Sequence, residues 1–151
     1  MTTTFESVED ILASVGRDLG TSRWFELDRG RVATFADTTE DRQWIHVDPE
    51  RAATGPFGGP IAHGFLILSL AAAVFEDVME MPWASTVVNY GLDKVRFPSP
   101  APVGCRIHAT GHLADATAID GGVQMVVRVQ FVREEGGKPV CVADAVIRVL
   151  A

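Results

Sequence analysis

The chain is poor in the residues that stabilise small proteins through covalent cross-links. It contains only two cysteines, Cys105 and Cys141, too few for a disulfide framework. Both fall on the apolar phase of expected strands, so a cysteine nucleophile has no support either. With 151 residues and a hydrophobic content of 47%, the chain is long enough to bury a core without such devices. We therefore expect one domain spanning residues 1–151.

An excess of positive charge is also missing. The 13 Lys and Arg residues face 20 Asp and Glu residues, a net charge of −7, and nucleic-acid binding needs a basic face. The longest apolar run, residues 64–74, falls far short of the roughly 20 residues needed to cross a bilayer. The opening residues MTTTFESVED do not form a basic-then-apolar leader. We expect a cytoplasmic protein with neither a nucleic acid nor a membrane as partner.

Several common catalytic and cofactor motifs are absent as well. The sequence has no G-x-S-x-G elbow, no Walker loop and no G-x-G-x-x-G after a strand. His108 and His112 share one face of an expected strand, but no cysteine or acid lies near them at ligand spacing. We therefore expect neither a metal nor a cofactor.

The first sixty residues predict short helices around one strand. Ser7 can cap a helix that ends near Gly16 or Gly20, and residues 22–27 have the pattern of a strand. Asp28 can start a second helix, whose apolar positions fall on one face at spacings of three and four: Val32, Phe35 and Ala36.

The second helix must end soon after Asp41 if Asp41 is to act together with His46. Residues five apart on an α-helix point about 140° away from each other, so the chain has to leave the helix between them, around residues 43–44. Asp48-Pro49 then restarts a helix, with Asp48 as N-cap and Pro49 at the first helical position. His46 is therefore expected in a tight connection between two helical pieces.

A Gly/Pro-rich loop over residues 54–60 precedes the longest expected helix, which runs from Gly64 to Met81. Its first three turns are apolar nearly all round, which predicts burial on all sides. The following seventy residues alternate with period two and predict antiparallel strands, with a bulge near Gly91 and glycine turns at 120–122 and 136–137. Such a sheet, curled around a helix, is an α+β plan. A free sheet face or edge leaves room for a second copy, so we expect a homodimer.

The acid and the histidine in the middle of the chain form a candidate acid/base pair. A histidine can exchange a proton near neutral pH, and a neighbouring carboxylate can share a water with it. Gly64 adds a second element, because the free N–H groups at the start of a buried helix can stabilise a developing oxyanion. Taken singly, each feature has a plainer explanation: Asp41 and His46 as solvated surface, and Gly64 as relief of crowding.

Four further side chains are candidates for contacts at this site. His63 precedes Gly64, although a histidine at a helix entry more often is a satisfied core group. Ser69 is expected to bond back to the backbone or to the loop. Lys94 and Arg96 share a strand face that alternation places toward solvent, and in an acidic protein they are candidates for gripping a phosphate.

These residues together resemble a known family. The segments Phe35-Ala36, 41–48 (DRQWIHVD), Phe57-Gly58 and 61–64 (IAHG), followed by Ser69-Leu70, resemble the MaoC-like dehydratases, the (R)-specific enoyl-CoA hydratases. The stretch 91–104 (GLDKVRFPSPAPVG) resembles the strand that follows the central helix in that family. The Gln-Trp before the isoleucine and histidine is closest to the nodulation-protein-N-like branch.

The resemblance implies a hot-dog fold, in which a curled antiparallel sheet surrounds a long central helix, and a homodimer. It implies reversible hydration of a trans-2-enoyl-CoA to an (R)-3-hydroxyacyl-CoA, without a cofactor. The catalytic acid is then Asp41, the catalytic histidine His46 and the thioester-holding N–H that of Gly64. The candidates for substrate binding are Gln43, Ile61, His63, Ser69, Lys94 and Arg96.

Alternatives remain open within this resemblance. The substrate carrier could be acyl carrier protein in place of CoA, or the chain could bind acyl thioesters without catalysis; a thioesterase fits less well, because its acid usually lies elsewhere. One departure from the family pattern is that Gln43-Trp44 stands where Asn-Pro is commoner. Gln43 could keep the amide's role of orienting the acid or the water, whereas Trp44 removes the proline that would break the helix.

Overall fold

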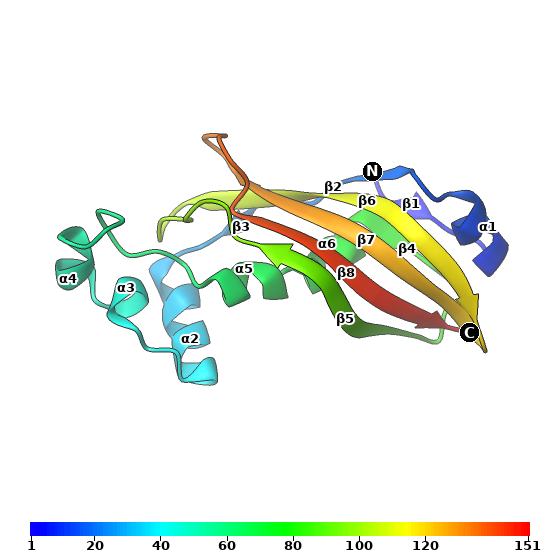
Figure 1. Ribbon diagram of the computed structural model, residues 1–151, viewed down its shortest axis with the longest axis horizontal. Coiled ribbons are helices and arrows are strands. Elements are labelled where there is room, and N and C mark those ends of the chain that lie inside the picture. The colour runs from blue at the N-terminus through cyan, green and yellow to red at the C-terminus, as the bar shows by residue number, and fades with distance from the viewer.

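The computed structural model describes residues 1–151 as an antiparallel sheet with short helices at both ends and along one face (Figure 1). The helices are α1 Val8–Ala13, α2 Arg29–Thr39, α3 Trp44–Val47, α4 Pro49–Ala53, α5 Gly64–Ser69 and α6 Ala71–Val78. The strands are β1 Thr3–Thr4, β2 Asp18–Thr21, β3 Phe25–Glu26, β4 Met79–Glu80, β5 Thr86–Arg96, β6 Arg106–Ile119, β7 Gly122–Arg133 and β8 Cys141–Leu150. No helix combines the length and apolar character that crossing a membrane requires.

The main sheet has the strand order β2-β6-β7-β8-β5, with β3 also paired to β6, and all its pairings are antiparallel. Strands β1 and β4 form a separate parallel pair. Helices α2, α3 and α4 gather at one end of the sheet and α1 at the other, while α5 and α6 lie along it (Figure 1). The segment that carries Asp41 and His46 is therefore set apart from the long strands.

Strict alternation builds the core side of the sheet. On β7, every second residue has its side chain fully buried: Val123, Met125, Val127, Val129 and Phe131. The predicted strands and glycine turns are confirmed here, because residues 120–121 join β6 to β7 and Gly121 has φ +76°. The predicted slip near Gly91 is also confirmed, since the register of β5 against β8 shifts between Asn89 and Gly91.

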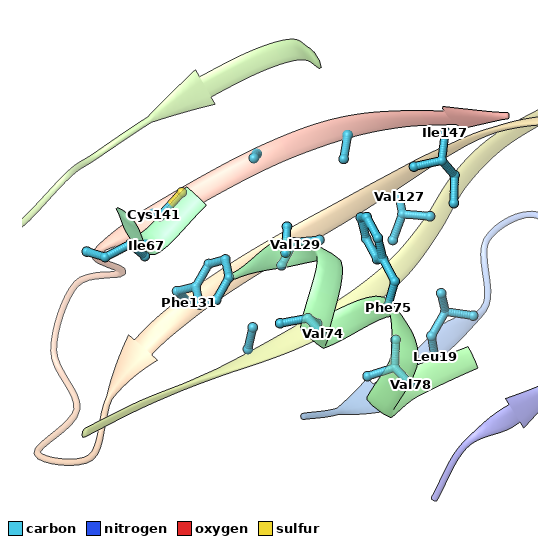
Figure 2. Packing of buried hydrophobic residues seen from close by; sticks show 14 of the residues in the cluster. Leu19, Ile67, Val74, Phe75, Val78, Val127, Val129, Phe131, Cys141 and Ile147 are labelled. Carbon is cyan, nitrogen blue, oxygen red and sulfur yellow. The ribbon is translucent and has the colours of Figure 1, made fainter. Parts of the chain in front are cut away.

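Helix α6 presses its apolar face onto this side of the sheet (Figure 2). Val74, Phe75 and Val78 of α6 lie among Leu19, Val127 and Val129 in one buried cluster. Ala143 and Ala145 on β8 point inward and are small, so the helices can approach that strand closely. A curled antiparallel sheet around a central helical segment is the α+β hot-dog fold that the sequence resemblance implied.

The central helix differs from its prediction in two ways. It is not one helix to Met81: α5 and α6 meet at Leu70, and α6 ends at Val78. The Ser69 hydroxyl donates to the carbonyl of Leu66, 2.7 Å away, and Leu70 N–H bonds to Ile67 instead. This side-chain competition tightens the turn and interrupts the α-helical pattern.

The prediction that this helix is buried on all sides is also wrong. Phe65 is 71% exposed, although Leu66 and Ile67 next to it are buried. An apolar helix surface gives no sign of which side will be covered, and within this chain nothing covers the Phe65 side.

Two boundaries in the first half of the chain also differ. The expected strand at 22–27 is replaced by β2 and β3, because the Ser22 hydroxyl accepts from Ala109 N–H and interrupts the ladder. Helix α2 starts after the predicted cap Asp28 but ends at Thr39, before Asp41, with Glu40 in the left-handed region at φ +63°. The expected position of the break at 43–44 is therefore wrong, and His46 lies inside the short helix α3.

Candidate active site

Asp41 is delivered to the site by a sharp exit from α2. The left-handed Glu40 ends the helix and turns the chain at the cost of about 1–2 kcal/mol for a residue with a side chain. The Asp41 side chain stays 48% exposed, and its carboxylate accepts only a long bond, 3.4 Å, from Gln43 N–H. The acid is thus accessible to a small molecule.

His46 faces this acid with a defined tautomer. Its Nδ1 lies 2.6 Å from the carbonyl oxygen of Ile61, which can only accept, so Nδ1 carries the hydrogen. Nε2 therefore keeps its lone pair and lies 4.0 Å from Oδ2 of Asp41. With a side chain only 7% exposed, the ring is fixed in place. The structure thus brings together the two residues that the sequence paired.

Burial lowers the pKa of His46 below its ordinary value of 6.5, because the charged form loses hydration. The hydrogen bond to Ile61 opposes this shift, the neighbouring His63 adds to it and the Asp41 carboxylate opposes it. The ring is therefore neutral at pH 7 and available as a proton acceptor.

His63 is the third member of this cluster. Its ring stacks on that of His46, with centroids 3.8 Å apart and planes 24° apart, and it is 2% exposed. Its Nε2 lies 2.9 Å from the main-chain carbonyl of Asp41, so Nε2 is the donor, whereas Nδ1 is buried without a partner. The expectation of a satisfied core histidine holds for only one of its two nitrogens.

The three side chains have the chemistry of metal ligands. One carboxylate oxygen of Asp41 and one ring nitrogen each of His46 and His63 lie within 4.8 Å of one another. However, lone pairs of imidazoles lie in the ring plane, and stacked rings direct them side by side rather than toward one ion. The arrangement is better suited to proton chemistry than to metal binding.

Gly64 opens α5 immediately after His63. The first N–H groups of a helix have no partner within it and are available as donors. Gly64 lines a cavity of about 290 Å³ together with Phe57, Ile61 and Phe97. A Cβ at position 64 would lie 3.1 Å from the Phe97 ring. Glycine therefore leaves the backbone at the start of α5 accessible from the cavity.

The remaining candidates are spread over other places. Ile61 acts through its main chain, as the acceptor for His46, and Gln43 has no side-chain hydrogen bond at the start of α3. Ser69 donates to Leu66, as predicted, and lines a groove of about 240 Å³ between the helices and β5. Neither the Gln43 side chain nor the Ser69 hydroxyl makes a hydrogen bond to Asp41 or His46.

Lys94 and Arg96 lie elsewhere, on the sheet face opposite the core. They line a hollow of about 350 Å³ with Arg128 and Asp144. Their predicted exposure is confirmed.

Trp44, which stands in place of the commoner proline, has a packing role that the sequence did not reveal. The Arg51 guanidinium lies 4.4 Å above its ring. A Cβ at Gly55 would come within 2.8 Å of the same ring, so only glycine fits there. Because Glu40 already ends α2, no proline is needed, and Trp44 anchors the helix that carries His46. The only sign of this role in the sequence is Gly55, in the loop that follows α4.

Comparison with known proteins shows the family to which the chain is related. The family model described as MaoC like domain matches residues 10–135. The chain is 46% identical to 3-hydroxyacyl-thioester dehydratase Z of Mycobacterium tuberculosis over 149 residues, which covers 98% of this chain and 99% of that protein. It is 40% identical over 141 residues to nodulation protein N of Rhizobium meliloti, covering 91% of this chain and 88% of that one.

A solved structure of similar fold is R-hydratase PhaJ1 from Pseudomonas aeruginosa. It superposes with a TM-score of 0.71 at 26% identity, covering 90% of this chain and 81% of that one. The relatives named here thus include both a dehydratase and a hydratase.

Proposed function

Since this chain belongs to the MaoC-like dehydratase family and is a hydro-lyase, we propose that it reversibly hydrates a trans-2-enoyl-CoA to an (R)-3-hydroxyacyl-CoA. The observation that carries the proposal is the tautomer of His46. Its Nδ1–H is committed to Ile61, so the Nε2 lone pair faces the Asp41 carboxylate across 4.0 Å. A water that bridges these two groups would be oriented and activated at once.

Hydration then proceeds with His46 as proton carrier. Its Nε2 takes one proton from the water while the oxygen forms a bond to C3 of the enoyl group, and Asp41 accepts a hydrogen bond from the second O–H. The N–H of Gly64 stabilises the enolate oxygen that develops on the thioester. The imidazolium beside Asp41 returns its proton to C2, which completes addition of one water on one face. Dehydration follows the same steps in reverse.

The test is loss of enoyl absorbance with crotonyl-CoA, measured on the wild type, Asp41→Asn and His46→Gln. We expect both substitutions to reduce turnover by at least about a hundredfold, the lower end for general acid/base groups. Near-normal turnover in either variant would contradict this mechanism. An inactive wild type that still binds the thioester would favour the non-catalytic alternative.

The carrier is a separate part of the proposal. Lys94 and Arg96 place two cationic side chains beside a hollow, where they can bind phosphate groups of CoA. Acyl carrier protein would present its phosphate in a different position. We expect Lys94→Ala together with Arg96→Ala to raise KM for crotonyl-CoA and to leave KM for crotonyl-N-acetylcysteamine, which has no phosphate, unchanged. Faster turnover of the crotonyl group on acyl carrier protein than on CoA would favour the carrier-protein alternative.

A homodimer is also part of the proposal, and strand β5 supports it. It is the edge strand of the sheet, yet its apolar side chains Val87, Val88, Tyr90 and Leu92 are between 43% and 57% exposed. Unprotected apolar edges associate, and a second copy would cover this one. We expect a dimer by light scattering, a monomer for Leu92→Arg, and an unchanged dimer for Val15→Arg, which is similarly exposed outside β5. A monomeric wild type would overturn this part.

A further inference from the structure

We propose that His63 is a positioning residue, which holds the Asp41 loop and the His46 ring in one fixed arrangement. The proposal rests on the proposed function, since it assigns a role within that same site. Three observations carry it: a hydrogen bond to the loop, a stacked ring and a buried nitrogen without a hydrogen-bond partner.

The first observation concerns the loop of residues 40–43. Its other hydrogen bonds are local, such as Gln43 N–H to the Asp41 carboxylate and Arg42 Nε to Asp37, with no partner more than five residues away. The bond from His63 Nε2 to the Asp41 carbonyl instead spans 22 residues and ties the loop to the start of α5. Glu40 is held in the left-handed region, and such a conformation persists only where the surroundings impose it. His63 is the long-range contact in a position to impose it.

The second observation concerns the plane of the His46 ring. Its hydrogen bond to Ile61 restrains the ring at one edge, through Nδ1. The stacked ring of His63, with its centroid 3.8 Å away, restrains the tilt of the ring from its face. His63 is supported in turn by the Phe35 ring of α2, 4.9 Å from it. Nε2 of His46 is therefore aimed at Asp41 by two contacts, one at the edge of the ring and one on its face.

The third observation separates positioning from proton transfer. The single hydrogen of neutral His63 is already donated to Asp41, and a proton on Nδ1 would be a buried donor without an acceptor. It would also place two charged rings in contact whenever His46 is charged. The titratable groups that face His63 are Asp41 and His46, while α2 contributes the apolar Phe35. His63 therefore acts through its neighbours.

The test compares two substitutions at this position. In His63→Gln, the side-chain amide can place an N–H near the Nε2 site and keep the bond to Asp41, whereas His63→Leu cannot. We expect His63→Leu to lower kcat for crotonyl-CoA by about a hundredfold with little change in KM, because misplacing a catalytic group by about 1 Å has that effect. His63→Gln should recover at least about tenfold of that loss. Melting temperatures for both variants show whether the fold is retained.

A second measurement uses the free protein and does not depend on activity. The chain has four histidines, so their ring nitrogens can be followed individually by NMR during a pH titration. In His63→Gln, the neighbouring imidazole that helps to lower the pKa of His46 is gone, and we expect His46 to take up its proton at higher pH. His108→Gln, which removes a histidine stacked on Trp24, is the matched control and should leave kcat and the His46 titration unchanged.

Normal kcat in His63→Leu, equal losses in both variants, or an unshifted His46 titration in His63→Gln would each overturn the proposal. If the wild type shows no hydratase activity, the proposed function fails. The titration of His46 would still decide whether His63 is coupled to it.

Discussion

Strand β7 and the segment from Glu40 to Gly64 are held in place by different means. Strand β7 has a neighbour on each side from Gly122 to Phe131, and its inward side chains are fully buried. The segment has no ladder, keeps the Asp41 side chain 48% exposed and depends on a few individual contacts. Stability and chemistry are thus assigned to separate parts of the chain. Changes in β7 should alter the free energy of unfolding, whereas changes in the segment should alter kcat.

The strongest way to test this division is to remove a large side chain from β7. Phe131 is fully buried against the helices (Figure 2). Phe131→Ala should lower the free energy of unfolding by about 3–5 kcal/mol, because it loses apolar burial and leaves a cavity. Urea unfolding measures this change. Activity per folded molecule should stay close to that of the wild type, and a loss of kcat beyond the loss of folded protein would contradict the division.

The segment offers a matched pair of glycines. A Cβ at Gly55 would meet the Trp44 ring at 2.8 Å, whereas a Cβ at Gly59 in the same loop would meet nothing within 4 Å. Gly55→Ala should displace α3 and His46, and lower kcat by about tenfold, a partial form of the loss that a 1 Å misplacement causes.

Gly59→Ala is the control for this loop and should keep wild-type kcat. Crotonyl-CoA turnover and the melting temperature of each variant check the pair. Equal kcat for the two variants would show that the position of Trp44 does not determine that of His46.

The pH dependence tests the segment without a mutation. Burial lowers the pKa of His46 from its ordinary value of 6.5, so Nε2 stays unprotonated to a pH below that value. We expect kcat/KM to be retained at pH 6.5 and to fall only at lower pH. Because the unfolded chain binds this proton more readily, His46 also disfavours the folded state as pH drops through 6.5. A fall in kcat/KM that already begins above pH 6.5 would contradict the buried environment of His46.

The smallest effect is expected on the outer face of the sheet. The hydrogen bond from Arg128, 2.7 Å long, lowers the pKa of the Asp144 carboxyl below its ordinary value of 3.8. A carboxyl with a lowered pKa stabilises the fold above its unfolded pKa, and this contribution is lost as pH falls through the folded value. Asp144→Asn should cost less than about 1 kcal/mol, as is usual for exposed ion pairs, and leave kcat unchanged. Urea unfolding at pH 7 and below pH 3 should show the difference shrinking.

The parts that could be predicted from sequence follow from local rules. The alternation of Val127 and Val129 is a direct consequence of strand geometry, and the slip near Gly91 is visible as a change of phase. The Asp28 cap is equally local, since its carboxylate accepts from Arg31 N–H three residues on. The pairing of Asp41 with His46 follows from their residue types and spacing, and the family resemblance adds their catalytic roles; the structure brings the two side chains together.

The parts that could not be predicted depend on which of several possible partners a group contacts in the folded chain. The bond from His63 to a carbonyl 22 residues earlier leaves no trace in the pattern, because any residue at position 41 supplies that carbonyl. The interruption at Leu70 results from competition between the Ser69 hydroxyl and a backbone N–H. The exposure of Phe65 depends on which neighbours are present. The sequence shows Trp44 only as a residue in place of the commoner proline, whereas its packing against Gly55 anchors the helix that carries His46.

Ile61 has a consequence for how this protein can change. Its N–H donates to Ile45 and its carbonyl accepts from His46. Two hydrogen bonds therefore join the two ends of the stretch that runs from residue 46 to residue 61. The tip of that stretch is open to added atoms at Gly59, whereas Gly58, at φ +71°, favours glycine. Insertions and exchanges at the tip can therefore accumulate while the proton on the His46 ring stays where it is.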